Sequence, residues 1–183
     1  MTDNQIILPH GGYRKLMSYQ MATVVHDYTH EFVLRYIDSK SRTRDQMEQA
    51  ARSGKQNIVE GTMASGTSKK TEIKLLGVAR ASFEELLIDY EDFLRQSHIA
   101  IWGKYHPEVA KIRKLGYMTD KSYMTYMAYM GAGESAANCA LCIVHQTNYL
   151  LDQQLRKIEK EFLENGGLTE RMYNARNKNR TTK

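Results

Sequence analysis

Proline and cysteine are scarce in this chain of 183 residues, which contains two of each. Because proline interrupts helices, and both prolines lie outside the long periodic segments, the chain has room for long helices. No stretch approaches the roughly 20 apolar residues that cross a bilayer, and the first residues lack the basic and apolar regions of a signal peptide. We therefore expect a cytoplasmic protein that makes no use of a membrane.

The two cysteines, Cys139 and Cys142, form a C-x-x-C pair, a pattern found in metal and redox sites. No second pair exists, the flanking residues are apolar, and no strand is predicted before them, so we interpret both as small core residues. His26 and His30 are an i, i+4 pair, but the H-E-x-x-H pattern and a third ligand are missing. The glycine-rich phosphate loop is absent too, and no nucleophile is paired with a base. We predict a protein that is not an enzyme, with no metal and no cofactor.

The net charge of +5 comes from the C-terminal residues. Residues 171–183 contain five basic residues and no acidic one, so the rest of the chain balances at zero. Such a basic tail, assigned to residues 168–183, is a candidate arm for nucleic acid or another polyanion, whereas the alternative is a solvated end that only adds solubility.

Apolar residues recur at spacings of three and four, and no segment shows the alternation of a strand. Thr43 is a suitable N-cap for a second helix, and Thr67 or Ser68 for a third. Short loops between long helices make them antiparallel neighbours. We therefore predict an all-α fold, an antiparallel up-down four-helix bundle in one domain over residues 1–167. The four predicted helices cover about 13–35, 43–60, 68–97 and 134–165.

An insert over residues 98–131 interrupts this pattern. Pro107 at a first helical position and Gly116 just past Lys114 predict one short helix, and a second is predicted at about 120–130. In the second piece a Tyr-Met pair recurs every three residues, starting at Tyr123. It is either a lid packed on its own bundle or a subunit or partner interface, where Tyr and Met are enriched.

Basic residues gather at three places, and we predict that they bind nucleic acid through phosphate contacts. One group lies on or before the second predicted helix, one opens the third, where an anion would meet both amides and side chains, and one lies in the tail. The candidates are Arg42, Arg44, Arg52, Lys55, Lys69, Lys70, Lys74, Arg171, Arg176, Lys178 and Arg180.

The segment Arg-Ser-Gly-Lys-Gln-Asn-Ile-Val-Glu-Gly, followed by a Ser/Gly/Thr turn and by Ala-Arg-Ala-Ser-Phe-Glu-Glu-Leu, resembles the 23S rRNA intervening-sequence family of four-helix-bundle proteins. Accessory proteins of diversity-generating retroelements look like relatives. The resemblance covers about residues 13–97, and Val59 stands where alanine is commoner. The matching positions are Arg52, Asn57, Ile58, Glu60, Gly61, Ala79, Arg80, Ser82, Glu85 and Leu86.

The resemblance implies a homopentameric ring with a positively charged surface, and for the retroelement relatives an accessory role with a reverse transcriptase. We assign the family motif a structural role. Gly61 would take the left-handed conformation that ends the second helix. Asn57 and Glu60 would turn back to hydrogen-bond the backbone of residues 62–68, or Lys69 and Lys70. The leading hypothesis is a ring-forming protein that binds structured RNA or RNA:DNA, and the competing one is a protein-interaction scaffold with no nucleic-acid role.

Overall fold

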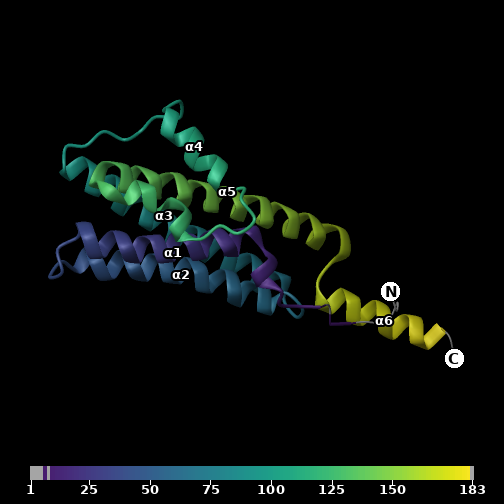
Figure 1. The fold of residues 1–183 in the computed structure, drawn as a ribbon. Coiled ribbons are helices and arrows are strands. Elements are labelled where there is room, and N and C mark those ends of the chain that lie inside the picture. Colours follow the sequence, from purple (N-terminus) through teal and green to yellow (C-terminus); the bar gives the residue numbers. More distant parts are fainter. Residues whose placement is uncertain (1–5, 8, 182–183) are drawn as a thin grey trace.

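The computed structural model describes residues 6, 7 and 9–181, and its regular elements are all helices, as predicted. Four long helices lie side by side (Figure 1), with contacts between α1 and α2, α2 and α3, α3 and α5, and α5 and α1. Within the described part of the chain, no helix has the length and apolar character required to span a membrane. The long helices are α1 (Met17–Tyr36), α2 (Arg42–Ala64), α3 (Lys69–Gln96) and α5 (Gly133–Asn165).

The core is built from the apolar stripes of these helices. Phe32 of α1 meets Tyr90 and Phe93 of α3 edge to face, with ring centroids 4.9 and 5.0 Å apart. Phe32, Tyr90, Tyr28 and Phe83 are fully buried, whereas Phe93 is half-buried. Burying a large apolar side chain contributes about 1.5–3 kcal/mol, so these rings are a main source of the stability of the helical assembly.

Two glycines allow α2 and α3 to approach closely. A Cβ at Gly54 would lie 2.5 Å from the Phe83 ring, and one at Gly61 would lie 3.3 Å from the Glu72 carbonyl oxygen and from Cβ of Leu75. Gly61 is therefore buried inside α2, which continues to Ala64. The predicted helix end at Glu60 and the left-handed Gly61 are both wrong, because this glycine serves a helix crossing.

The helix starts also differ in detail from the prediction. Ser68 caps α3, as one of the two expected candidates, and its hydroxyl accepts from the Thr71 amide at 3.1 Å. In α2, however, the cap is Ser41, whose hydroxyl accepts from the amide of Thr43, the expected cap. Residues 13–15 form a separate 3-10 turn before α1.

The insert forms α4 (Pro107–Leu115) and the 3-10 helix η2 (Tyr123–Gly131). Side chains three residues apart eclipse each other in a 3-10 helix, which matches the three-residue repeat. Tyr126 and Met130 are buried against α1 and α5, and the Tyr36 hydroxyl donates to the Met130 carbonyl at 2.8 Å. The insert is therefore packed on its own helices, as in the first of the two interpretations.

The basic tail forms a helix, α6 (Leu168–Thr181), for which the sequence pattern predicted no regular structure. It follows α5 after a turn at Gly166, which has a φ of 65° and thus uses the freedom of glycine. Figure 1 shows α6 extending beyond the packed helices, beside the described N-terminal residues.

Candidate nucleic-acid interface

The basic residues predicted on α2 lie among carboxylates. Arg42 lines a groove with Asp45, Glu85 and Asp89, and the pKa of the Asp89 carboxyl is raised by burial and by nearby carboxylates. Arg52 is exposed beside Asp45 in a second depression, which also contains Glu48 and two histidines. These carboxylates weaken the attraction of either position for a phosphate.

Lys55 and Arg44 are half-buried. The Lys55 ammonium lies 3.1 Å from Nδ1 of His26, and an Asp27 carboxylate oxygen lies 3.0 Å from the same nitrogen. That nitrogen either donates to the carboxylate or accepts from the ammonium. The structure thus places Lys55 in a local polar cluster between α1 and α2.

The three lysines at the start of α3 differ in whether they are paired with carboxylates. The Lys69 side chain is 13% exposed, and its ammonium lies 2.9 Å from Glu72 and 3.8 Å from Glu161. Lys69 is thereby engaged in joining α3 to α5. Lys70 and Lys74, in contrast, are exposed, and no ion pair of either is found among the described residues.

One face of α6 combines basic and aromatic groups around a shallow depression. Tyr173, Arg176 and Arg180 lie on it at helical spacing, together with Met172. Tyr173 is 66% exposed, and no acidic residue follows Glu170 in this helix. Lys178 is exposed on the same helix. Lys178 follows Arg176 by two residues and therefore lies roughly half a turn around the helix, away from this depression. We call the set Tyr173, Arg176 and Arg180 the α6 basic face.

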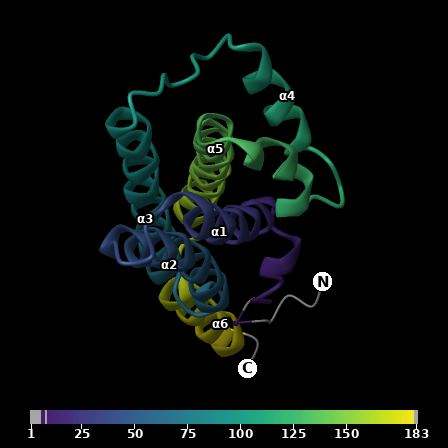
Figure 2. The ribbon, with the colours of Figure 1, turned by 60° about the vertical axis from the view of Figure 1, so that its left-hand side comes forward.

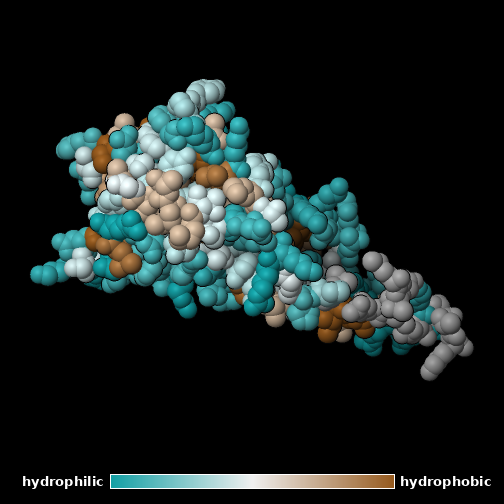
Figure 3. Space-filling view, in the orientation of Figure 1, coloured by the Kyte–Doolittle hydropathy of each residue, from teal (hydrophilic) through white to brown (hydrophobic). Residues whose placement is uncertain are grey.

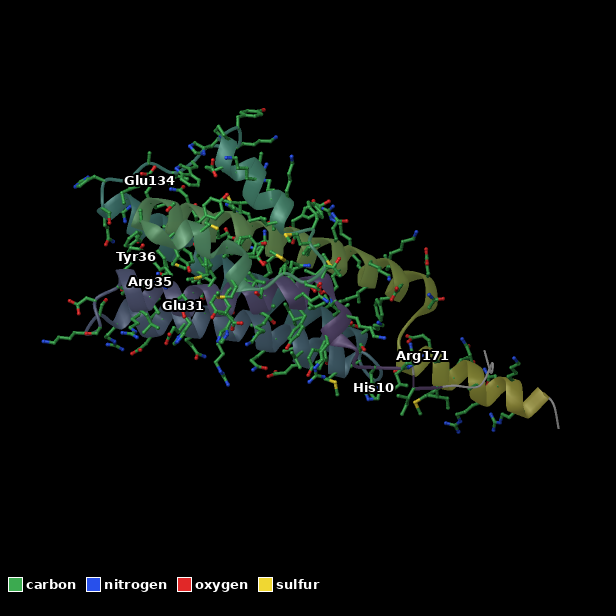
Figure 4. The ribbon with its side chains drawn as sticks, in the orientation of Figure 1. His10, Glu31, Arg35, Tyr36, Glu134 and Arg171 are labelled. Atoms are coloured by element: carbon green, nitrogen blue, oxygen red, sulfur yellow. The ribbon has the colours of Figure 1, made fainter. Side chains whose placement is uncertain are left out.

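Arg171 has a structural role at the start of this helix. Its guanidinium donates to the Ile6 carbonyl at 3.2 Å and to the Gly66 carbonyl at 3.4 Å. Figure 4 shows Arg171 near the N-terminal segment that carries His10. Arg171 therefore links α6 to the α2–α3 turn, and its half-buried side chain is less available to a phosphate than those of the α6 basic face.

The motif residues do not form the predicted clasp around the α2–α3 turn. The Asn57 amide donates to the Ser53 carbonyl at 2.9 Å, one turn back in α2. Glu60 is exposed, and the described residues give it no hydrogen bond or ion pair. Arg80 instead joins two helices, because it donates to Asp152 of α5 at 2.8 Å and to Glu84 at 3.0 Å.

Sequence reasoning missed a pocket of about 490 Å³ beneath the insert. Figure 2 shows how the segment after α3 arches over the end of α5 to reach α4. We call this the α4–α5 pocket, and its lining includes Trp102, Arg113, Tyr117, Leu141, Cys142 and Tyr149. The sequence signal for this pocket was the lone tryptophan, together with aromatic residues near lysine and arginine. These residues are far from one another in the sequence, so their proximity in the fold could not be predicted.

The walls of this pocket are held by specific contacts. The Trp102 amide donates to the Asn138 side chain at 2.7 Å, and its indole N–H donates to Glu134 at 3.1 Å, near the start of α5 (Figure 4). The indole also stacks on His106, with centroids 4.4 Å apart. Burial raises the pKa of the Cys142 thiol to about 11, while Arg113 acts in the opposite direction. Arg113 therefore lies near this thiol.

Comparison with family models, with curated proteins and with solved structures finds no match for this chain. Among the described residues, no group of three His, Cys, Asp or Glu side chains is placed to hold a metal ion. Cys139 packs in the core, as predicted, whereas Cys142 is only half-buried and lines the α4–α5 pocket. Among the candidate sites, the α6 basic face is distinguished by its charge, because its arginines are exposed and no acidic residue follows Glu170 in this helix.

Proposed function

We propose that this protein binds structured RNA or RNA:DNA without catalysing a reaction, and that the α6 basic face is its main phosphate-binding surface. The observation that carries the proposal is the position of this face. Arg176 and Arg180 are exposed on a helix that extends beyond the packed helices, and no Asp or Glu side chain follows Glu170 in the described part of this helix. Arg42 and Arg52 of α2, in contrast, have carboxylate neighbours.

The chemistry of this face suits nucleic acid. Arginine binds phosphate through two parallel N–H groups, and its charge attracts the backbone regardless of sequence. Tyr173 adds an exposed ring on which an unpaired base can stack. Lys70 and Lys74 at the start of α3 remain secondary candidates because they are exposed.

The wider architecture in this proposal is an antiparallel up-down four-helix bundle that assembles as a homopentamer. The ring of contacts from α1 through α2, α3 and α5 back to α1 supports the bundle. The pentamer and a partnership with a reverse transcriptase rest on the family resemblance alone. A five-fold ring would present five copies of the α6 basic face, and its mass in solution would be five times the 21.1 kDa of one chain.

The test compares two triple charge reversals in binding to a structured RNA. Arg176→Glu, Lys178→Glu and Arg180→Glu change the two arginines of the α6 basic face and the exposed Lys178 of the same helix, whereas Arg35→Glu, Lys40→Glu and Arg95→Glu make the same charge change in exposed residues at the far end of the helices. We expect the first set to lower affinity at least tenfold and nearly equally for unrelated RNA sequences. Equal losses from the two sets would refute the assignment of α6.

A second candidate function, a protein-interaction scaffold, is favoured by apolar exposure at the same end of the molecule. Leu163 is 77% exposed, and Met172 and Ile7 are also exposed. Figure 3 shows hydrophobic residues on the surface near the start of α6. Protein partners that remain bound in a pull-down after nuclease treatment would support the scaffold, and partners lost with the nucleic acid would support RNA binding.

A further inference from the structure

The geometry points to a nucleotide-binding site in the α4–α5 pocket, which would hold the base of one nucleotide against Trp102 and its phosphate near Arg113. This pocket is separate from the α6 basic face, since it is formed by the insert, α4 and α5. Its volume of about 490 Å³ lies within the range of small-ligand sites.

The inner part of the pocket suits a flat, apolar ring. Leu141 and Val109 are almost fully buried in its lining, and the indole of Trp102, which stacks on His106 with one face, also lines the pocket. The hydrogen bonds of Trp102 to Asn138 and Glu134 fix this surface before any ligand arrives. A preformed wall reduces the entropy that binding must spend on ordering side chains.

Two tyrosines at the pocket extend the aromatic surface toward solvent. Tyr117 is 80% exposed and Tyr149 is 61% exposed. They come from different elements, one from the turn after α4 and one from α5. Exposed aromatic residues beside an aromatic pocket are the arrangement on which unstacked bases bind.

The charge of the pocket selects an anion. Arg113 and Lys104 line it, and within the described part of the chain neither forms an ion pair. Among the described residues that line the pocket, Glu91 is the one carboxylate, so the two basic residues leave an excess of positive charge. A planar ring that carries a phosphate satisfies both the aromatic wall and these cations.

The choice of a nucleotide over other aromatic anions rests on the proposed function, because RNA supplies this chemistry. A free mononucleotide and a nucleotide within a single strand share it, and they differ in the further phosphates of the strand. Trp102 is the lone tryptophan of the chain, so its fluorescence reports on this pocket directly.

The experiment titrates adenosine monophosphate and, separately, a short single-stranded RNA into the full-length protein, while Trp102 emission is excited at the red edge of its absorption. We expect a saturable change with at least one of the two ligands, and the one that binds more tightly identifies the source. Adenosine lacks the phosphate and ribose 5-phosphate lacks the base, so each should bind at least tenfold more weakly than the mononucleotide.

Three variants localise the effect. Arg113→Gln and Tyr149→Ala should each weaken binding about tenfold, whereas Lys111→Gln removes a charge from the same helix at a residue paired with Glu108 and should change it less than about twofold. Far-UV circular dichroism and the melting temperature show whether each variant folds. Equal binding by Arg113→Gln and the unaltered protein, or ribose 5-phosphate binding as tightly as the mononucleotide, would overturn the site.

The site and the proposed function fail in different ways. Salt-dependent binding of structured RNA with no saturable Trp102 response to either nucleotide ligand would overturn the pocket and leave the proposed function intact. A Trp102 response to the mononucleotide, with no binding of RNA at any salt concentration, would support the pocket and overturn the proposed function.

Discussion

Replacing each of two helical glycines by alanine tests the close packing of α2 on α3. Alanine favours a helix by about 1 kcal/mol over glycine, and this gain applies equally to Gly54→Ala and Gly77→Ala. At Gly77 the new methyl group meets nothing within 4 Å. At Gly54 it would lie 2.5–2.7 Å from three atoms of the Phe83 ring, which is fully buried and cannot move without disturbing its neighbours.

The magnitude follows from these two environments. Overpacking a core costs about 1–3 kcal/mol, and it applies to Gly54→Ala alone. The two variants should therefore differ by about 1–3 kcal/mol in the free energy of unfolding, with Gly77→Ala more stable than the parent protein. Urea unfolding followed by circular dichroism measures the difference, which corresponds to roughly 1 M in midpoint. If Gly54→Ala stabilised the protein as much as Gly77→Ala, the close crossing would be refuted.

Three further predictions concern individual side chains. Glu60→Ala should change the free energy of unfolding by less than about 0.5 kcal/mol, because the carboxylate is exposed without a hydrogen bond among the described residues. A loss of about 1 kcal/mol or more, on the order of a lost hydrogen bond, would support the predicted clasp instead. Tyr126→Phe should leave the free energy of unfolding in urea unchanged or raise it, since the buried Tyr126 hydroxyl lacks a partner in the described structure. Tyr90→Phe should lower it by about 1–3 kcal/mol, because the Thr29 hydroxyl loses the hydrogen bond that Tyr90 donates. The reverse order of stability would contradict both assignments. Burial raises the pKa of the Glu72 carboxyl above its ordinary value of 4.5, so the folded protein takes up a proton at a higher pH than the unfolded chain does. The parent protein should therefore gain stability relative to Glu72→Gln as pH falls through the raised pKa toward 4.5. A stability difference that does not vary with pH would contradict this.

Local patterns in the sequence were sufficient for much of the fold. Spacings of three and four predicted the long helices, because one face of each is buried along its length. Pro107 correctly marked the first residue of α4, and Ser68 the cap of α3. Each of these signals depends on residues within one or two helical turns.

The errors arose where one residue type has two structural uses. Glycine can end a helix or permit a close crossing, and the flanking residues of Gly61 do not distinguish them. What decides is the position of Leu75 on another helix. An asparagine side chain can hydrogen-bond the backbone of its own helix or that of a following turn. Asn57 forms the first kind of bond, with the Ser53 carbonyl, where the second kind was predicted.

The sites were only partly predictable for a related reason. The basic residues could be identified from composition. However, some of the carboxylates beside the basic residues of α2 belong to α3, as Asp89 beside Arg42 does. The α4–α5 pocket depends on Trp102 meeting Asn138, which lies 36 residues further along the chain. Periodicity within a segment contains no information about such long-range contacts.

The central claim is that the protein acts by presenting a basic surface to nucleic acid, and the salt dependence of RNA binding tests it most directly. Each phosphate contact lowers the slope of log affinity against log salt by roughly 0.7–0.9. We predict a steep negative slope for the unaltered protein, which becomes shallower by roughly 2–3 in the triple variant of Arg176, Lys178 and Arg180. An affinity that does not vary with salt, or a slope that the triple variant leaves unchanged, would contradict the account.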